Sequence, residues 1–296
     1  MHNIPAIGFI GVGTMGEPMA LNLAKAGIPL VVWNRSAERC DALVRAGATA
    51  ASHLDDLFAR SETIILMLAN EAATDGVLGR GSDAFAKRVV GHRLVAMGTM
   101  PPEYSERLAG EVRAAGGRYV EAPVSGSRIP AEAGQLVALL AGEPDDFAAI
   151  GPLLAAMCGE VFECGSVPNA LRMKLAVNVF LITLVTGLAE ATHFATRHNL
   201  DLEKLAAILD AGPMASDVSR IKVAKLVRGD FGRQAGISDV LKNSRLVVEA
   251  ARAARIASPL MDACYSLYRD TEALGFGNDD MVTVIRAFEQ QTNHIA

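Results

Sequence analysis

The chain lacks the cysteine and histidine patterns of secreted and metal-binding proteins. Its 296 residues include four cysteines and six histidines, and they form neither a C-x-x-C pair nor an H-E-x-x-H motif. Scattered cysteines of this kind are typical of free thiols in a reducing compartment. We therefore expect no metal site and a cytoplasmic location.

Aromatic residues and clustered charge are also scarce. Aromatics make up 5% of the chain, against 51% hydrophobic residues in total, so the core must consist mainly of Ala, Val, Leu and Ile. The net charge of −5 is small, and no run of Lys and Arg occurs. Nucleic-acid binding would need such a basic cluster, and no nucleic-acid partner is expected.

The sequence contains no segment typical of a signal peptide or a membrane span. Residues 1–5 have no basic n-region, and the apolar run that follows them is broken by glycines. The longest apolar stretch, Val177–Ala189, is interrupted by polar residues and is shorter than the roughly 20 residues that a bilayer requires. We predict a soluble protein in which this stretch is a buried helix.

The length of the chain favours two domains, and its first half alternates short apolar runs with helical stretches. The predicted strands are residues 6–11, 30–33, 63–68, 94–97, 119–122 and 136–141. Continuous apolar strands separated by helices indicate a parallel sheet covered on both faces.

The pattern changes near residue 165. No β run follows residue 169; instead, Ala, Leu and Val recur at three- and four-residue spacings, and residues 170–197 read as one long helix. The helical patterns are broken at Asn199, Gly212-Pro213, residues 229–236, Ser258-Pro259 and residues 275–277. We expect an α/β domain over residues 1–166 and an all-α domain over residues 167–296, joined by the long helix.

A glycine-rich turn follows the first predicted strand. The segment Gly11-Val12-Gly13-Thr14-Met15-Gly16 fits G-x-G-x-x-G, whose glycines permit a tight turn and let backbone and helix N-terminus approach a pyrophosphate. A purely structural turn is the alternative. The position between a strand and a helix favours dinucleotide binding, and hence a Rossmann-type domain with Gly11, Gly13, Thr14, Met15 and Gly16 at the cofactor.

The end of the second predicted strand bears on the choice between NAD and NADP. An Asp or Glu there would bind the ribose hydroxyls, but the chain has Asn34-Arg35-Ser36. Arg35 offers a planar fork suited to phosphate, with two small polar side chains beside it, although a solvated surface arginine is the plain alternative. We predict that NADP, as NADPH, is the cofactor.

Two further motifs carry a family resemblance. One is Glu121-Ala122-Pro123-Val124-Ser125-Gly126-Ser127, and the other is Lys174 with Asn178, four residues apart on one helix face. With the glycine turn they resemble the β-hydroxyacid dehydrogenase family, which includes 3-hydroxyisobutyrate dehydrogenases and glyoxylate/succinic semialdehyde reductases and is related to 6-phosphogluconate dehydrogenase. The stretch 122–136 is most similar to the semialdehyde reductases, and the resemblance covers essentially the whole chain.

The resemblance implies roles for individual residues. Carbonyl reduction needs a proton donor, and Lys174 matches the family's general acid and base, while Asn178 matches a substrate-binding asparagine. A lone helical lysine is ordinarily solvated, but the neighbours of Lys174 are apolar, and desolvation lowers a lysine pKa. The other matching positions are Ser125, Gly126 and Ser127 for the substrate carboxylate, and Leu68, Ala69, Asn70, Thr99 and Lys242 for the cofactor.

The chain departs from the family at several positions. It has Asn243 where Lys242 is usually followed by Asp, Ala235 where many members have a pocket Phe, and Gly98 where a Ser is usual. Residues 168–170 replace a G-x-G turn before Lys174. These changes alter the expected pocket wall and leave the physiological substrate and the reaction direction open.

Three functions can share this architecture. The first is an NADP-dependent reductase of a small aldehyde or keto acid, or the reverse oxidation of a hydroxy acid. The second is imine reduction. Related imine-reducing enzymes usually have another residue in place of the lysine, so the presence of Lys174 argues against this function. The third is a non-catalytic NADP-binding protein, in which the lysine would be lost. The apolar helical half also predicts a homo-oligomer, a dimer or a tetramer.

Overall fold

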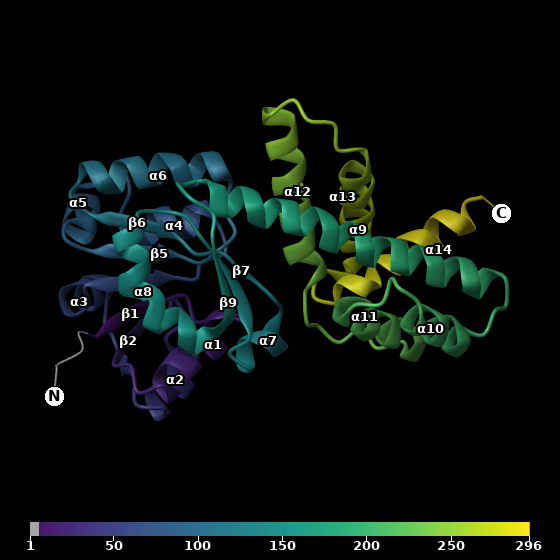
Figure 1. Cartoon of the computed structure of the whole chain (residues 1–296), viewed down its shortest axis with the longest axis horizontal. Helices are drawn as coiled ribbons and strands as arrows, with labels where there is room; N and C mark the ends of the chain where they lie inside the picture. The colour runs from purple at the N-terminus through teal and green to yellow at the C-terminus, as the bar shows by residue number, and fades with distance from the viewer. Residues whose placement is uncertain (1–5, 296) are drawn as a thin grey trace. The chain divides into compact units, whose positions relative to one another are not determined.

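The computed structural model describes residues 6–295, so the signal-peptide prediction for residues 1–5 lies outside the described residues. The chain forms two compact units, Met1–Lys174 and Leu175–Ala296, which are described separately below (Figure 1). Ala170 and Leu171, which follow the predicted domain boundary at residue 166, are buried in clusters of the first unit.

A six-stranded parallel sheet with the order β3-β2-β1-β4-β5-β6 forms the centre of the first unit. Its strands are β1 (Ile7–Ile10), β2 (Leu30–Trp33), β3 (Thr49–Ala50), β4 (Thr63–Leu66), β5 (Arg93–Ala96) and β6 (Arg118–Glu121). The strand order reverses direction at β1, so the carboxyl ends of β1 and β4 flank the point where dinucleotides bind in such sheets.

Both faces of this sheet are covered by helices, as Figure 1 shows. The helices of the first unit are α1 (Gly16–Lys25), α2 (Asp41–Arg45), α3 (Leu54–Arg60), α4 (Glu71–Leu78), α5 (Asp83–Val89), α6 (Pro102–Ala114), α7 (Arg128–Glu132) and α8 (Pro144–Met157). Phe9 packs with Met19 and Leu23 of α1 in one cluster, and Ile10 packs with Leu57 of α3 in another. Successive residues of a strand point to opposite faces, so a continuous apolar strand such as β1 contributes to both cores.

A second, three-stranded sheet corrects one expectation. Residues 136–141, expected in the parallel sheet, form β8 (Leu136–Leu140) between β7 (Val124–Ser125) and β9 (Cys158–Glu163). β7 and β8 are antiparallel, whereas β8 and β9 are parallel. The segment between β7 and β8 is too short for the crossover of a dozen or more residues that a parallel pair needs, so the chain turns back.

The second unit is helical, as predicted: no strand is assigned in its described part, residues 175–295. It contains most of α9 (Asn169–Arg197), followed by α10 (Leu202–Ala211), α11 (Asp217–Arg228), α12 (Ile237–Ala253), α13 (Pro259–Thr271), η2 (Glu272–Phe276), η3 (Met281–Val284) and α14 (Ile285–Asn293). The predicted breaks coincide with helix ends; for example, Asn199 adopts a φ of 55° just after α9.

Helix α9 is the long helix expected from the sequence. By length and composition alone it could cross a membrane, and 44% of its most apolar window is buried. One face supplies Leu175, Ile182 and Val185 to the core of the second unit, whereas Phe180 is 71% exposed. The expectation of a buried helix therefore holds for one face only.

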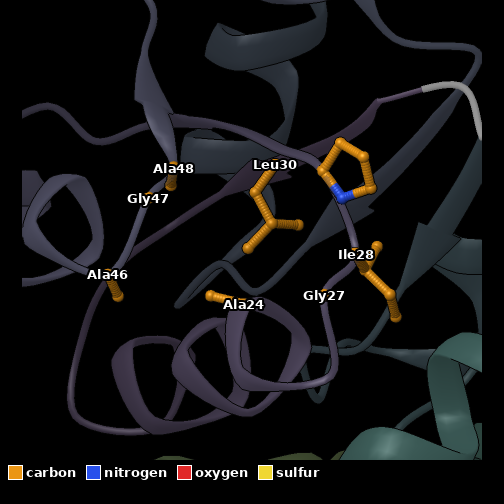
Figure 2. A pocket seen from close by; sticks show the side chains of 8 residues that line it. Ala24, Gly27, Ile28, Leu30, Ala46, Gly47 and Ala48 are labelled. Carbon is orange, nitrogen blue, oxygen red and sulfur yellow. The ribbon is translucent and has the colours of Figure 1, made fainter.

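The first unit has a small surface hollow of about 170 Å³, shown in Figure 2. It lies beside the amino ends of β2 and β3, where the side chains of Ala24 and Leu30 face each other. Its lining consists of Ala, Gly, Ile, Pro and Leu residues, so it offers no titratable side chain. The candidate cofactor-binding residues lie instead at the opposite edge of the sheet, where the strands have their carboxyl ends.

Candidate functional site

The glycine turn after β1 has the backbone geometry that a dinucleotide requires. Gly11 has a φ of +100°, and a Cβ added there would collide with the Met67 carbonyl. A Cβ on Gly16 would collide with the Gly11 carbonyl. A Cβ on Gly13, in contrast, would meet nothing within 4 Å. The first and third glycines are therefore required by the fold itself, and the second leaves space for a ligand beside the backbone.

The N-terminus of α1 offers free donors at this open space. Within residues 6–295, the amide groups of Gly13, Thr14 and Met15 donate to no other group; the Gly13 carbonyl accepts from Glu17 N at 3.0 Å. Met15, the residue preceding α1, makes no side-chain cap. Unsatisfied amides at a helix N-terminus attract anions, so these residues fit the pyrophosphate of a dinucleotide.

The three predicted residues in the loop after β2 have different roles. The side chain of Asn34 accepts from Val12 N at 3.0 Å and donates to Ser36 O at 3.0 Å, so it ties the glycine turn to this loop. Arg35 is exposed and has no ion pair with any residue in 6–295. Ser36, half-buried, precedes the short helix η1 (Ala37–Cys40) without capping it. Arg35 and Ser36 are thus the side chains left to bind a phosphate.

The loops after β4 and β5 come together at the same edge. A Cβ on Gly98 would lie 2.5 Å from the Leu68 carbonyl, which explains why glycine replaces the serine usual at this position. Thr99, the next residue, is half-buried. Asn70 caps α4, because its Oδ1 accepts from Ala73 N at 2.9 Å. Of the predicted residues here, Leu68, Ala69 and Thr99 border the sheet edge, whereas the side chain of Asn70 serves the helix.

The loop after β7 carries the predicted carboxylate-binding residues. Ser125 ends β7, and Ser127 precedes α7 without a side-chain cap. Neither hydroxyl makes a hydrogen bond within the described chain. Gly126 has a φ of +131°, and a Cβ there would lie 2.7 Å from a Leu136 methyl group. The turn therefore requires glycine and presents two hydroxyl groups that are free for a ligand.

Lys174 is buried without a partner. Only 7% of the residue is exposed, and within residues 6–295 its ammonium group forms no ion pair or hydrogen bond. Burial lowers the pKa of Lys174 to about 8. One turn later, Asn178 is 2% exposed, and its Nδ2 has no acceptor in the same range. Two orphaned polar groups on one helix stripe are the mark of a functional site rather than of a core.

Family models match both halves of the chain. The family model of the NAD binding domain of 6-phosphogluconate dehydrogenase matches residues 6–165. A second model, described as NAD-binding of NADP-dependent 3-hydroxyisobutyrate dehydrogenase, matches residues 169–288. The chain belongs to the β-hydroxyacid dehydrogenase family. The family prediction drawn from three sequence motifs is thereby confirmed, and the protein is an NAD(P)-dependent oxidoreductase.

Individual relatives cover almost the whole chain. Glyoxylate/succinic semialdehyde reductase 1 of Arabidopsis thaliana is 30% identical over 95% of this chain and 97% of its own length. The chloroplastic reductase 2 of the same plant is 31% identical over 96% of this chain and 79% of its own. The cytokine-like nuclear factor N-PAC of Xenopus tropicalis is 31% identical over 95% of this chain but only 53% of its own length.

Solved structures share the fold. A 3-hydroxyisobutyrate dehydrogenase from Salmonella typhimurium has a TM-score of 0.85 at 22% identity, over 95% of this chain and 99% of that chain. An imine reductase from Pseudomonas sp. has a TM-score of 0.65 at 26% identity, over 97% of this chain and all of that chain (100%). The Rossmann-type unit followed by a helical unit is thus the fold of this family.

The remaining predicted positions lie on the second unit. Lys242 and Asn243 are half-buried on α12. Ala235 precedes that helix, and its backbone N–H donates to Asp280 Oδ2 at 3.1 Å while its carbonyl accepts from Met281 N at 2.7 Å. The position is therefore held by its backbone, and its small side chain packs against the core of the second unit. That Lys242 reaches the cofactor stays a prediction.

One notable residue received no role from the sequence. Glu121, at the end of β6, is fully buried, and its Oε2 accepts from Leu171 N at 3.2 Å. Its Oε1 has no partner within residues 6–295. A single carboxyl group within the otherwise apolar predicted strand 119–122 was the available signal, since acids are rarely buried without a purpose. No group of three His, Cys, Asp or Glu able to hold a metal occurs in the same range.

Proposed function

We propose that the protein is an NADP-dependent reductase of a small aldehyde or keto acid, or an NADP-dependent dehydrogenase of the hydroxy acid in the reverse direction. Lys174 is the general acid and base. The observation that carries the proposal is the buried, unpaired ammonium group of Lys174, with the unpaired amide of Asn178 one turn later on the same helix. The plant relatives named for glyoxylate and succinic semialdehyde support the substrate class.

In reduction, bound NADPH would supply the hydride that adds to the carbonyl carbon. Lys174 gives its proton to the carbonyl oxygen, and Asn178 donates a hydrogen bond that orients the substrate. The hydroxyls of Ser125 and Ser127 and the N–H of Gly126 bind the substrate carboxylate. A lysine with a pKa of about 8 remains mostly protonated at neutral pH, so it is ready to act as an acid.

The cofactor is held along the carboxyl edge of the sheet. In this proposal Gly11, Gly13, Thr14, Met15 and Gly16 surround the pyrophosphate. Arg35 and Ser36 bind the 2′-phosphate, with Asn34 fixing their loop. Leu68, Ala69 and Asn70 belong to the cofactor loop after β4, Thr99 lies on the nicotinamide side, and Lys242 covers the cofactor.

Replacing Arg35 by Asp is expected to weaken NADPH binding at least tenfold more than NADH binding. A charged hydrogen bond to a phosphate is worth about 1.5–3 kcal/mol, and the new carboxylate would repel the 2′-phosphate. Fluorescence titration of both cofactors measures the ratio. Arg45→Asp, which changes an exposed arginine on α2, is the matched control and should leave the ratio unchanged. Wild-type preference for NADH would refute the assignment.

An assay of NADPH oxidation against aldehydes, 2-oxo acids and imines tests the reaction itself. We expect turnover with a small aldehyde or keto acid. The fold similarity to an imine reductase makes imine reduction the second candidate, which would be favoured if imines alone were turned over. Tight NADPH binding with no turnover of any of these would point to the non-catalytic alternative.

We also propose a homo-oligomer, most simply a dimer, formed through the helical unit. Helix α10 has no buried residue although it contains several apolar side chains, and Ile208 on it is 68% exposed. Exposed apolar surface of this kind is commonly covered by a second copy. Sedimentation velocity at micromolar concentration should show a dimer or tetramer, and Ile208→Glu should shift it toward monomer. A purely monomeric wild type would contradict the proposal.

The proposed location is the cytoplasm. All four cysteines are free thiols, and Cys40, Cys158 and Cys264 are buried. Free buried thiols suit a reducing compartment.

A further inference from the structure

Helix α9, which carries Lys174, begins without a local side-chain cap. In its first turn, Asn169 N donates to Ser166 O at 2.9 Å, and Arg172 N donates to Pro168 O at 3.1 Å. Leu171 N instead donates to Glu121 Oε2 at 3.2 Å, a partner fifty positions earlier in the chain. The four N-terminal amides of a helix need acceptors, and here a distant carboxyl group supplies one.

Glu121 is rigidly placed for this contact. Its backbone N–H donates to Ala141 O at 2.9 Å, and its carbonyl accepts from Ala141 N at 3.0 Å, so β6 is joined to the second sheet at this residue. The side chain is fully buried, and so are its neighbours Ala170 and Leu171 on α9. A carboxylate is favoured at a helix N-terminus because it opposes the positive end of the helix dipole.

We propose that Glu121 is a positioning residue for Lys174: it holds the first turn of α9 against the end of β6 and thereby fixes the point from which Lys174 projects. Leu171 lies less than one helical turn before Lys174, so a shift of the first turn is passed directly to the lysine. The proposal rests on the role given to Lys174 under the proposed function. A misplacement of about 1 Å at a reacting group can cost on the order of 100-fold in rate.

Protonation of Glu121 makes this support dependent on pH. Burial raises the pKa of Glu121 to about 7, while the Ser105 hydroxyl and the amides of Leu171 and Ala170 act in the opposite direction. A protonated carboxyl group is a weaker acceptor than a carboxylate, so the hold on α9 weakens as the pH falls below about 7.

Two acidic groups beside Glu121, Tyr119 and Cys164, stay protonated near neutrality. The side chains whose charge or hydrogen bonding affects it are Ser105 on α6, Tyr119 on β6, Cys164 after β9 and Arg172 on α9. Burial raises the pKa of both Tyr119 and Cys164 above their usual values. Glu121 is therefore the group that changes charge near neutrality at this place.

The test compares the full-length wild type with Glu121→Gln, both saturated with NADPH. Turnover in the reducing direction should show an acidic limb near pH 7 from Glu121 and an alkaline limb near pH 8 from Lys174. We expect Glu121→Gln to lower maximal turnover by about 10- to 100-fold. It should also abolish the acidic limb, keep the alkaline one and leave the NADPH affinity unchanged.

Amide hydrogen exchange gives a readout independent of activity. Residues 169–174 should exchange faster in Glu121→Gln than in the wild type, because the first turn of α9 has lost its charged acceptor. Asp146→Asn is the matched control: this buried carboxyl group of the first unit pairs with Arg93 at 2.8 Å and lies on α8. It should change neither the acidic limb nor the exchange of residues 169–174.

The outcomes separate this inference from the proposed function. Wild-type exchange and an intact acidic limb in Glu121→Gln would overturn the role of Glu121 while leaving Lys174 as the acid. If Glu121→Gln fails to fold, Glu121→Asp is the deciding variant, because its side chain keeps the charge but is too short to reach Leu171 N. Turnover should then fall and the amide exchange of residues 169–174 should rise. Wild-type values of both would refute the proposal. Undiminished turnover in Lys174→Ala would instead refute the proposed function.

Discussion

Replacing Lys174 with alanine is expected to lower turnover by about 10²–10⁴-fold, the usual contribution of a positioned general acid. The change removes the proton donor but touches neither the glycine turn nor Arg35, so NADPH affinity should stay within experimental error of the wild type. Steady-state turnover and fluorescence titration of NADPH measure the two effects separately. This separation distinguishes an acid from a structural lysine.

The pH dependence should change sign with the direction of reaction. Reduction needs protonated Lys174, so turnover falls as the pH rises through about 8, whereas oxidation needs the neutral amine and rises over the same range. Lys174→Arg should be nearly as inactive as the alanine variant, because a guanidinium group stays protonated. Both variants should lose the limb near pH 8.

Lys204→Ala serves as the control, because its side chain is 81% exposed on α10. It should leave turnover and pH profile unchanged. Two results with Lys174→Ala would contradict the mechanism. If the variant retained turnover, another residue would be the acid. If it lost NADPH binding together with activity, Lys174 would be a structural residue.

Most of the fold followed from local patterns in the sequence. Apolar runs located five of the six strands of the parallel sheet to within a few residues, and the glycine and proline breaks located the helix ends of the second unit. β3 is two residues long, and β9 is exposed along most of its length, so neither produces an apolar run. The antiparallel pairing of β7 with β8 depends on tertiary contacts that periodicity does not encode.

The candidate site was predictable where backbone shape dictates the residue. The glycines at 11 and 16 are required by close contacts, and Lys174 and Asn178 share a helix face by spacing alone. Side-chain partners were not predictable: Asn34 bonds to Val12, and the helix that bears Lys174 is held by Glu121. These bonds join segments far apart in the sequence, so they appear only once the chain is folded.

A buried ion pair organises the second unit. Lys222 Nζ lies 2.8 and 3.0 Å from the two oxygens of Asp280, and these residues are 6% and 0% exposed. Asp280 also accepts from Gln234 N at 3.0 Å and from Ala235 N at 3.1 Å, so it fixes the loop that leads into α12. Lys242 lies on that helix, so the pair also supports a residue predicted to bind the cofactor.

Asp280→Ala is expected to destabilise the protein by about 3–5 kcal/mol, because Lys222 is left as an unpaired buried charge. Urea unfolding followed by circular dichroism measures the loss. Burial already lowers the pKa of Lys222 and Asp280 opposes this, so in the variant the lysine becomes neutral in the folded state more readily. Because the pKa of Lys222 is lower in the folded than in the unfolded state, the unfolded chain binds more protons. The variant should therefore recover stability as the pH rises.

Two further variants make the Asp280 prediction specific. Asp210→Ala removes an even shorter contact, 2.6 Å to Arg220, but both side chains are more than half exposed, so the unfolding midpoint should hardly move. Lys222→Met combined with Asp280→Leu removes both charges and should recover part of the stability lost in Asp280→Ala, since no charge is then buried alone. If Asp280→Ala were no less stable than Asp210→Ala, the buried pair would not be what holds the loop before α12, and the position of Ala235 and Lys242 would need another support.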